Sequence, residues 1–413
     1  VLPQSPQQLK QLLMVSGFDR YCQIAKCFRD EDLRGDRQPE FTQFDMELSF
    51  VEQNDIISLI EKLFNGINND LYSHRPIMAN PFPVLTYDYV MNTFGIDKPE
   101  LRTQELKLID VSDVCLKSDL KLFVEIINNG GVVKGIVADK IYTRGVIDKF
   151  TAKLQEKGAK GLAYIIWDEE GPKSPILKFF SEELQIQLLE KLGAKKGTTC
   201  FFQATDLHSA NEYLGYLRNL LISDMELTKE NENKLAYAWV VDFPMFEIDE
   251  EGNFAAKHHP FTKPKDEFVP LINEKAEKLR SGEKLSESDL KQLMLVRADA
   301  YDLVLNGNEV AGGSIRIFDK NLQRDIFTLL GLSQEQIDDR FGHIIKAFQY
   351  GVPPHGGIAI GFDRLLMVLR NSSSIREVMP FPKTQKGEDL MLKAPSEIDD
   401  KLLKEIGFKI VTE

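Results

Sequence analysis

The chain has 413 residues, of which 43% are hydrophobic, and its formal net charge is −13. A chain of this length can bury large cores, so two or three structural units are expected. The acidic balance is unlike that of a generic nucleic-acid binder, so any contact with RNA has to come from local basic patches.

The four cysteines lie at positions 22, 27, 115 and 200, and none belongs to a CxxC pair. This spacing argues against a zinc ribbon or a disulfide framework and favours a reducing compartment. Cys22 and Cys27 fall in a β-prone segment, where we expect buried thiols. No apolar run reaches the roughly 18 residues that span a membrane, and no signal peptide opens the sequence. We therefore expect a soluble, cytoplasmic protein.

The first fifteen residues predict a short helix. Ser5 suits the N-cap, Pro6 the first helical position, and Gln8 the reciprocal capping position. An apolar stripe follows, formed by Leu9, Leu12 and Leu13. Lys10 is expected to project elsewhere, where a lone lysine is normally a solvated charge.

The segment from residue 41 to residue 50 alternates strictly, which predicts a strand with one polar and one apolar face. The polar face carries Phe41, Gln43, Asp45, Glu47 and Ser49, and the apolar face carries Thr42, Phe44, Met46, Leu48 and Phe50. Residues 21–29 are also β-prone, so a long-looped antiparallel hairpin is predicted. The charged connector alone fits a solvated, self-neutralising turn equally well. The polar strand face next to Arg29 favours the floor of a polar pocket.

The residues of this hairpin match a known family. FRDED at 28–32, followed by RQPEFTQ at 37–43, closely resembles motif 2 of the class II aminoacyl-tRNA synthetases, and within them the bacterial-type aspartyl-tRNA synthetases. QSPQxxKQLLM at 4–14 is similar to the aspartate-binding segment of that family. Family members carry an anticodon-binding OB-fold domain and the dimer-forming motif 1 ahead of this point. Neither is recognised in this sequence, so we expect the chain to lack them.

The middle of the chain predicts amphipathic helices over residues 54–68 and 87–94, and then an α+β insert. Within the insert, helices are predicted over 145–157, 182–192 and 207–221, and strands over 162–167 and 198–203. The insert resembles in position and size the GAD insertion domain of the family, which implies a role near the tRNA. The expected domains are 1–104 (catalytic core, first part), 105–225 (GAD-like insertion) and 226–413 (catalytic core, second part).

An aromatic strand is predicted over residues 238–246, and the loop HHPFT follows at 258–262. Adjacent histidines cannot both face one metal from a regular element, and no third ligand has zinc-like spacing. A contact with an anionic substrate is favoured, and the resemblance implies that His258 contacts aspartate. Residues 268–298 predict a solvated, peripheral helix pair.

Two carboxylates, Asp302 and Glu309, flank a predicted hairpin turn at Asn306-Gly307. Hard oxygen ligands beside phosphates suit Mg²⁺. A paired-acid glycosidase is the rival interpretation, which the number of arginines disfavours. Alternation places Glu309 and Arg316 on opposite faces unless a bulge, which we expect at Gly312-Gly313, restores both to the pocket.

Residues 356–365 predict a strand of small residues that runs into a helix with Arg364 in its first turn, an arrangement that favours an anion at the helix N-terminus. The end of this segment, AIGFDR at 359–364, resembles motif 3 of the family, whose pattern is GxGxDR, and this implies that Arg364 binds the γ-phosphate of ATP.

Taken together, the resemblance implies an α+β fold with the antiparallel sheet of the class II synthetases, flanked by helices. The implied catalytic residues are Arg29 and Arg364. The implied ATP-binding residues are Arg29, Asp30, Glu31, Gln38, Phe41, Glu309, Gly361, Phe362, Asp363 and Arg364. The implied aspartate-binding residues are Ser5, Gln7, Lys10, Arg29, Gln43, Asp45, His258 and Arg316. Asp302 and Glu309 are implied to hold Mg²⁺ with ATP.

The implied reaction activates L-aspartate with ATP and transfers it to tRNA(Asp), in a homodimer when the protein is full-length. The alternatives are an enzyme that also charges tRNA(Asn), an asparagine synthetase of the same fold, and a non-catalytic paralogue. The last should have lost a motif arginine, but Arg29, Arg316 and Arg364 are all present. If asparagine replaced aspartate, Lys10 and Arg316 would lose a charged partner, at a cost of roughly 3–5 kcal/mol.

Overall fold

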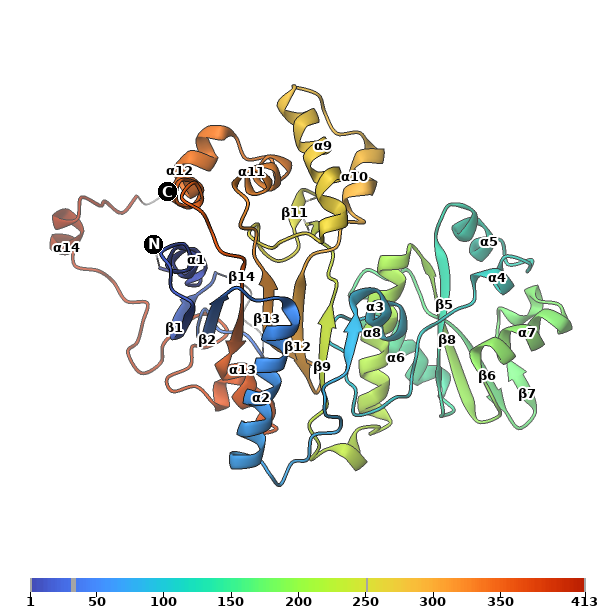
Figure 1. The fold of residues 1–413 in the computed structure, drawn as a ribbon. Helices are drawn as coiled ribbons and strands as arrows, with labels where there is room; N and C mark the ends of the chain where they lie inside the picture. Colours follow the sequence, from blue (N-terminus) through green and yellow to red (C-terminus); the bar gives the residue numbers. More distant parts are fainter. Residues whose placement is uncertain (1, 31–34, 250–251, 412–413) are drawn as a thin grey trace.

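The computed structural model describes residues 2–30, 35–249 and 252–411. A seven-stranded mixed sheet with the strand order β1-β2-β14-β13-β12-β9-β3 forms its centre (Figure 1). The strands are β1 (Arg20–Phe28), β2 (Glu40–Ser49), β14 (His355–Gly361), β13 (Asn308–Ile315), β12 (Ala300–Leu305), β9 (Tyr237–Val241) and β3 (Val84–Thr86). Every neighbouring pair is antiparallel except β3 and β9. The predicted α+β class, an antiparallel sheet flanked by helices, is confirmed.

The predicted hairpin is formed by β1 and β2, which pair antiparallel from Arg20 opposite Leu48 to Phe28 opposite Glu40. Its alternation is also as expected. Phe44 and Met46 pack against the main hydrophobic core, while Asp45 and Glu47 are buried on the opposite face. One face of β2 therefore belongs to the core, and the other belongs to a polar site.

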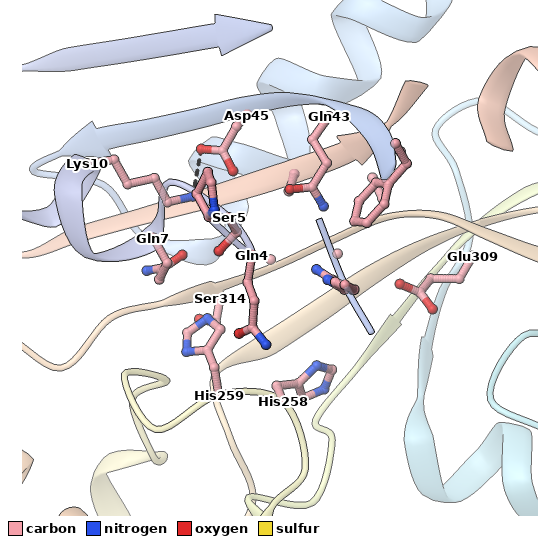
Figure 2. Close-up of a pocket in the computed structure, with 18 of the residues that line it drawn as sticks. Gln4, Ser5, Gln7, Lys10, Gln43, Asp45, His258, His259, Glu309 and Ser314 are labelled. Atoms are coloured by element: carbon pink, nitrogen blue, oxygen red, sulfur yellow. Dashed lines mark hydrogen bonds and ion pairs between the residues drawn. The ribbon is translucent and has the colours of Figure 1, made fainter. Parts of the chain in front are cut away.

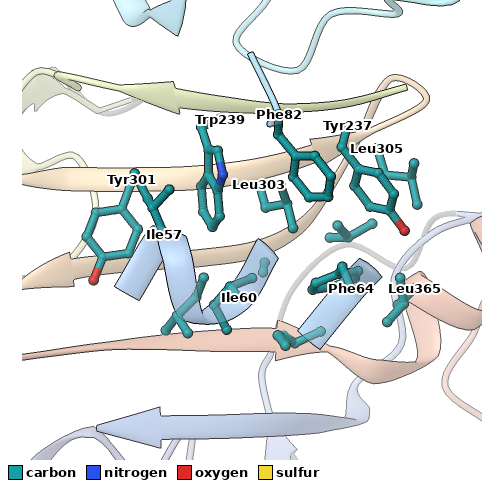
Figure 3. Close-up of a cluster of buried hydrophobic side chains, with 14 of the residues drawn as sticks. Ile57, Ile60, Phe64, Phe82, Tyr237, Trp239, Tyr301, Leu303, Leu305 and Leu365 are labelled. Carbon is teal, nitrogen blue, oxygen red and sulfur yellow. The ribbon is translucent and has the colours of Figure 1, made fainter. Parts of the chain in front are cut away.

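Helix α2 (Gln53–Leu71) and helix α13 (Phe362–Leu369) cover the core face of the sheet. Figure 3 shows Ile60 and Phe64 of α2 directed toward aromatic side chains of the central strands. Phe64 makes an edge-on contact with Tyr237, with 5.4 Å between the ring centroids. Burying one such side chain contributes roughly 1.5–3 kcal/mol. This packing fixes the strands that carry the site.

A second core lies among α3 (Tyr87–Phe94), α9 (Val269–Arg280), α10 (Glu287–Leu293) and α11 (Lys320–Leu329). The helix pair predicted over 268–298 is present as α9 and α10, but it is not merely solvated. Ile272 and Leu293 are fully buried in this core, which also contains Ala238 and Val240 of β9. The helix pair is therefore part of the folded core of the molecule.

Helix α1 (Gln7–Val15) corrects two expectations. Its N-cap is Pro6 and no side chain caps it, so Ser5 does not have that role. The predicted apolar stripe is right for Leu12, which packs against a hydrophobic cluster, but wrong for Leu9, which is 69% exposed whereas Lys10 and Met14 are buried. Carboxylates on β2 hold the lysine inward, and charge pairing overrides the apolar pattern. Of the two hairpin thiols, Cys27 is buried as expected.

The other hairpin thiol, Cys22, is exposed, so the expectation of a buried thiol is wrong there. Cys22 lies opposite Met46, whereas Cys27 lies opposite Phe41 on the polar face of β2. The remaining helix of the second half, α12 (Gln334–Phe348), packs against α1. A two-stranded sheet of β10 (Phe246–Ile248) and β11 (Phe254–Ala256) and a short helix α14 (Asp400–Glu405) complete this part of the chain.

A second sheet of five strands, in the order β4-β5-β8-β6-β7, is built from residues 109–205. Its strands are β4 (Ile109–Asp110), β5 (Val132–Ala138), β6 (Ala163–Asp168), β7 (Gly171–Lys173) and β8 (Thr198–Thr205). Its helices are α4 (Ser112–Cys115), α5 (Lys121–Asn128), α6 (Arg144–Gln155), α7 (Glu182–Leu192) and α8 (Leu207–Asp224). The Ser181 hydroxyl caps α7 and Gly193 ends it, as predicted. None of the described helices is both long and apolar enough to cross a membrane.

Candidate active site

A cavity of about 1080 Å³ lies on the polar face of the large sheet. Three arginines from distant parts of the chain, Arg29, Arg316 and Arg364, line it together. Figure 2 shows Lys10 and Asp45 in its wall, with His258 and His259 opposite them. The sheet brings these residues together because β2, β14 and β13 are neighbours in it.

A buried cluster of opposite charges forms one end of the cavity. Lys10 Nζ lies 2.8 Å from Asp45 Oδ1 and 3.0 Å from Glu47 Oε2. Arg316 donates to the same Glu47 carboxylate through Nε at 2.9 Å and Nη2 at 3.1 Å. Each of these four side chains is at most 2% exposed. Two cations and two carboxylates are therefore locked together out of contact with water.

Glu47 is the centre of this cluster. Burial alone would raise the pKa of its carboxyl, but the positive charges of Arg316 and Lys10 outweigh burial and lower the pKa to about 2. For Asp45, burial has the larger effect and raises the pKa despite the Lys10 charge. Glu47 does not line the cavity but lies behind Lys10 and Arg316, where it fixes both cations. We assigned it no role from sequence, although its place on the same strand face as Asp45 is a signal that could have found it.

The space for Glu47 exists because residue 357 is glycine. A Cβ at Gly357 would lie 1.9 Å from Glu47 Oε2 and 2.2 Å from the Met46 carbonyl oxygen. The glycine of β14 is therefore required by the carboxylate of β2, its neighbour in the sheet. The close fit of Gly357 and Glu47 thus links β14, the strand of the motif 3 segment, to β2, the strand of the motif 2 segment.

The histidine loop contributes to the same end of the cavity. His259 Nε2 lies 2.8 Å from Arg316 Nη1, and Ser314 Oγ accepts a hydrogen bond from that nitrogen at 2.6 Å. Burial and the nearby Arg316 charge lower the pKa of His259 well below its usual value, so the ring is neutral and can accept this bond. His258 also lines the cavity, edge-on to Phe243. The sequence singled out His258, and the structure adds its neighbour as the one that contacts Arg316.

The other end of the cavity is more open. The Arg29 guanidinium lies over the Phe41 ring, 5.0 Å from its centroid. Arg364 donates to the Glu309 carbonyl oxygen at 3.0 Å and to Asp36 Oδ2 at 3.3 Å. Asp363 Oδ2 accepts a hydrogen bond from the backbone N–H of Thr42 at 2.7 Å, which ties the start of α13 to β2. At this end one arginine therefore lies over an aromatic ring, and a second, in the first turn of α13, is held by a carbonyl oxygen and a carboxylate.

The hairpin of β12 and β13 has the predicted turn, in which Asn306 and Gly307 have φ values of 48° and 75°. The bulge occurs at a different place from the one expected. Leu303 pairs with Ala311 and Val304 with Glu309, so the extra residue is Val310, not one of Gly312-Gly313. Val310 and Ala311 are consecutive, yet both pack into the core, so the alternation of side chains between the two faces of β13 shifts by one residue there. The bulge still brings Glu309 and Arg316 to the same cavity.

Two carboxylates converge beside Gly312. A Cβ at this glycine would lie 2.8 Å from Asp302 Oδ1 and 3.5 Å from Glu309 Oε1. Asp302 Oδ1 is buried and has no hydrogen-bond partner in the described part of the chain. Burial, and then the Glu309 charge, raise the pKa of Asp302 well above its usual value. An orphan carboxylate oxygen next to a second carboxylate fits a divalent cation. Among the described residues no group of three or more protein ligands surrounds such a site, so further ligands would have to come from a substrate.

Most of the remaining predicted site residues line the cavity, but not all of them do. Ser5, Gln7, Asp30, Gln38, Gln43 and Gly361 line the cavity. Gln38 Oε1 also accepts from the backbone N–H of Lys383 at 2.8 Å, which anchors the segment after α13. Phe362 is 43% exposed and does not line the cavity, because it points outward at the start of α13. Glu31 lies outside the described residues.

The family model of the class II tRNA synthetases (D, K and N) matches residues 1–385. The chain belongs to this family. It is 46% identical to the aspartate-tRNA(Asp/Asn) ligase of Halothermothrix orenii and 47% identical to that of Thermodesulfovibrio yellowstonii, over 99% of this chain and 66% and 67% of those proteins. It is 44% identical to the aspartate-tRNA ligase of Macrococcus caseolyticus, over 100% of this chain and 67% of that protein.

The chain thus spans about two thirds of the length of these relatives. Among solved structures, an aspartyl tRNA synthetase from Entamoeba histolytica aligns with 92% of this synthetase-family chain and 51% of its own, at 17% identity and a TM-score of 0.45.

Proposed function

We propose that this chain carries the catalytic part of an aspartate-tRNA ligase, which activates L-aspartate with ATP and passes the aspartyl group to tRNA(Asp). The observation that carries the proposal is the meeting of Arg29, Arg316 and Arg364 in one cavity. The reaction brings the α-carboxylate of aspartate to the α-phosphate of ATP, and two anions repel each other. Fixed cations relieve this repulsion without a nucleophilic side chain.

At the buried end, Arg316 and Lys10 would bind the β-carboxylate of aspartate. Gln43 and Asp45, with Ser5 and Gln7, would bind its ammonium group. His258 would contact the substrate from the opposite wall. Because Glu47 already neutralises part of the charge on Arg316 and Lys10, asparagine would not leave two bare cations. The discrimination expected from this contact is therefore about 1.5–3 kcal/mol, the value of a hydrogen bond to a charged group, and not the roughly 3–5 kcal/mol of an unpaired buried charge.

At the open end, Arg29 would bridge the two reactants at the α-phosphate and Arg364 would hold the γ-phosphate. Phe41 would stack on adenine, on the ring face over which Arg29 now lies. Asp30, Glu31, Gln38, Gly361 and Asp363 would complete the nucleotide site. Asp302 and Glu309 would hold Mg²⁺ with ATP, and the ion would add positive charge against the phosphates. The residues of the chain itself bind, orient and neutralise the two substrates.

For the second step, we propose that residues 105–225 act as an insertion domain near the tRNA and that the full-length protein is a homodimer. A second candidate is an enzyme that charges both tRNA(Asp) and tRNA(Asn). The names of two of the relatives above, at 46% and 47% identity, favour it. Transfer of aspartate to each purified tRNA in turn separates the two candidates.

The decisive experiment is the aspartate-dependent exchange of pyrophosphate with ATP, which needs no tRNA. Exchange with aspartate, and much weaker exchange with asparagine, is the expected result. Exchange that requires another amino acid would overturn the proposal. Formation of free asparagine from aspartate, ATP and ammonia would instead identify an asparagine synthetase of the same fold.

A further inference from the structure

Arg75, in the loop after α2, is a buried arginine that the proposed reaction does not use. It is 2% exposed. Its five hydrogen bonds all go to oxygens of neutral groups: Val368 O at 3.1 Å, Leu369 O at 2.6 Å, Asn371 Oδ1 at 2.9 Å, Asn233 O at 3.3 Å and Glu232 O at 3.4 Å. Buried charges are normally paired with an opposite charge. Two of the five acceptors of Arg75 are the last carbonyls of a helix, and a third, Asn371, lies just after it.

That helix is α13, which begins with the segment that contains Arg364. Val368 and Leu369 are its last residues, so their carbonyl oxygens lie at the negative end of the helix dipole and lack the regular partner four residues later within the helix. Val368 O also accepts the backbone N–H of Asn371 at 3.2 Å. A guanidinium is suited to this position because it presents several donors in a fixed plane. Arg75 therefore holds the C-terminal end of the short helix whose first turn carries Arg364.

Two further partners of Arg75 belong to the segment that leaves the insert. Glu232 and Asn233 lie between the end of α8 and the start of β9. In Figure 1 the loop after α2 runs at the base of the sheet between α13 and this segment. A cavity of about 580 Å³ lies between the two, with Ser223 and Glu232 on one side and Met367 and Asn371 on the other. Packing does not fill this space, so the polar link through Arg75 connects its walls.

We propose that Arg75 is a positioning residue that holds α13, and with it Arg364, in register with the segment that leaves the insert. The proposal rests on the proposed function, in which Arg364 binds the γ-phosphate of ATP. Aspartate binding should be independent of Arg75, because Lys10 and Arg316 lie on α1 and directly after β13. A merely structural arginine would lower the melting temperature without separating the two substrates.

The test compares Arg75→Lys with Arg102→Lys. Arg102 is a matched control because its Nη1 also donates to Glu232 O, at 3.4 Å, whereas its other side-chain bonds go to Glu100 and not to α13. Arg75→Lys should weaken ATP binding about fivefold in calorimetry, since a small displacement of a phosphate ligand is costly. It should also speed hydrogen exchange of the amides of residues 366–372. Arg102→Lys should change neither, and neither variant should change aspartate binding.

Asn371→Gly covers the case in which Arg75→Lys fails to fold. It removes one acceptor of Arg75, and glycine suits the backbone there, where φ is 53°. A smaller change of the same kind, about twofold, is expected. Equal effects of the Arg75 and Arg102 variants, or unchanged ATP binding and α13 exchange, would overturn the inference. If the unaltered chain bound no ATP, the proposed function would fail, and the exchange of the α13 amides would still decide whether Arg75 holds this helix.

Discussion

The two ends of the cavity differ in exposure. At one end, each of four charged side chains is at most 2% exposed: Lys10, Asp45, Glu47 and Arg316. At the other end, Arg29 and Asp30 are exposed. The buried group is carried by a helix, a strand and the residue that follows β13, all held by the core of the sheet. The exposed group belongs to the connector of a hairpin. The two ends therefore differ in how their charges are held before a substrate binds.

The difference suits the two ligands of the proposed reaction. A small amino acid can be selected only by charges that are already in place, and the buried cluster provides them. A nucleotide has a large aromatic surface and several phosphates, so exposed cations and one ring can hold it, although salt screens them. Changes at the buried end should thus reduce both stability and activity, while changes at the open end should reduce activity alone.

The largest effect is expected for Arg316→Leu. It removes the proposed β-carboxylate ligand and leaves Glu47 buried without its main partner, at a cost of roughly 3–5 kcal/mol in the free energy of unfolding. Aspartate-dependent pyrophosphate exchange should fall by about 100-fold or more. The double variant Glu47→Gln/Arg316→Leu should regain stability but not activity, which separates the two roles. Near-normal exchange in Arg316→Leu would remove the residue from the site.

The matched control is Arg297→Leu. Arg297 pairs with Asp88, whose side chain is 61% exposed, so the loss should be below about 1 kcal/mol with unchanged exchange.

Gly357→Ala should come next. The added Cβ would overlap the Glu47 carboxylate and the Met46 carbonyl oxygen, so we expect a loss of about 3 kcal/mol or more in urea unfolding. Gly66→Ala in α2 is the control, because no atom beyond its chain neighbours and the adjacent helix backbone lies within 4 Å of the position that its added methyl group would occupy. It should stabilise by about 0.5–1 kcal/mol. Wild-type stability in Gly357→Ala would mean that Glu47 does not occupy the space beside this glycine.

The residues of the two ends also differ in how well their positions could be predicted from the sequence. The alternation of β2 correctly predicted which face is polar, because the hydrophobic period of a strand is a local signal. The same reasoning placed Leu9 in the core and Lys10 outside, since a helix was expected to bury its apolar residues. The opposite occurs because Asp45 and Glu47, on a strand 35 and more positions later, attract the lysine. Such non-local charge pairing is not visible in the local pattern of a helix.

The hairpin of β12 and β13 gives the same lesson. Sequence reasoning required a bulge between Glu309 and Arg316, and the structure has one, but at Val310. The glycines offered the more obvious signal, yet Gly313 is needed for another reason. A Cβ there would lie 2.3 Å from the Gly357 carbonyl oxygen. Close packing between strands, like the need for Gly357 beside Glu47, depends on neighbours that the sequence does not reveal.

The buried end should also make stability depend on pH. Burial lowers the pKa of His258 to about 4, and the pKa values of His259 and His355 are lowered in the same direction. Between about pH 6.5 and 4 the unfolded chain takes up protons that the folded chain does not, so stability falls as the pH falls. Below about pH 4.3, protonation of Glu47 in the unfolded state adds a further loss down to about pH 2.

Urea unfolding at several pH values measures this effect, which is expected to reach about 3 kcal/mol for His258. His258→Gln should flatten the part between pH 6.5 and 4, and the exposed His74 provides the control variant His74→Gln. A pH-independent free energy of unfolding in this range would contradict the burial of the histidine loop.

The smallest effect, and the one confined to the open end, is expected for Phe41→Ala. Loss of a stacking ring should raise the KM for ATP about tenfold, since stacking on one base contributes roughly 1–3 kcal/mol. The KM for aspartate should not change, and stability should change little because the ring packs against the exposed Arg29. Phe362→Ala is the control, because Phe362 is exposed outside the cavity although the motif suggested an ATP contact. If both variants raised the KM for ATP equally, Phe362 would contact ATP, as the motif suggested. If only Phe41→Ala raised it, adenine would stack on Phe41, the ring beneath Arg29.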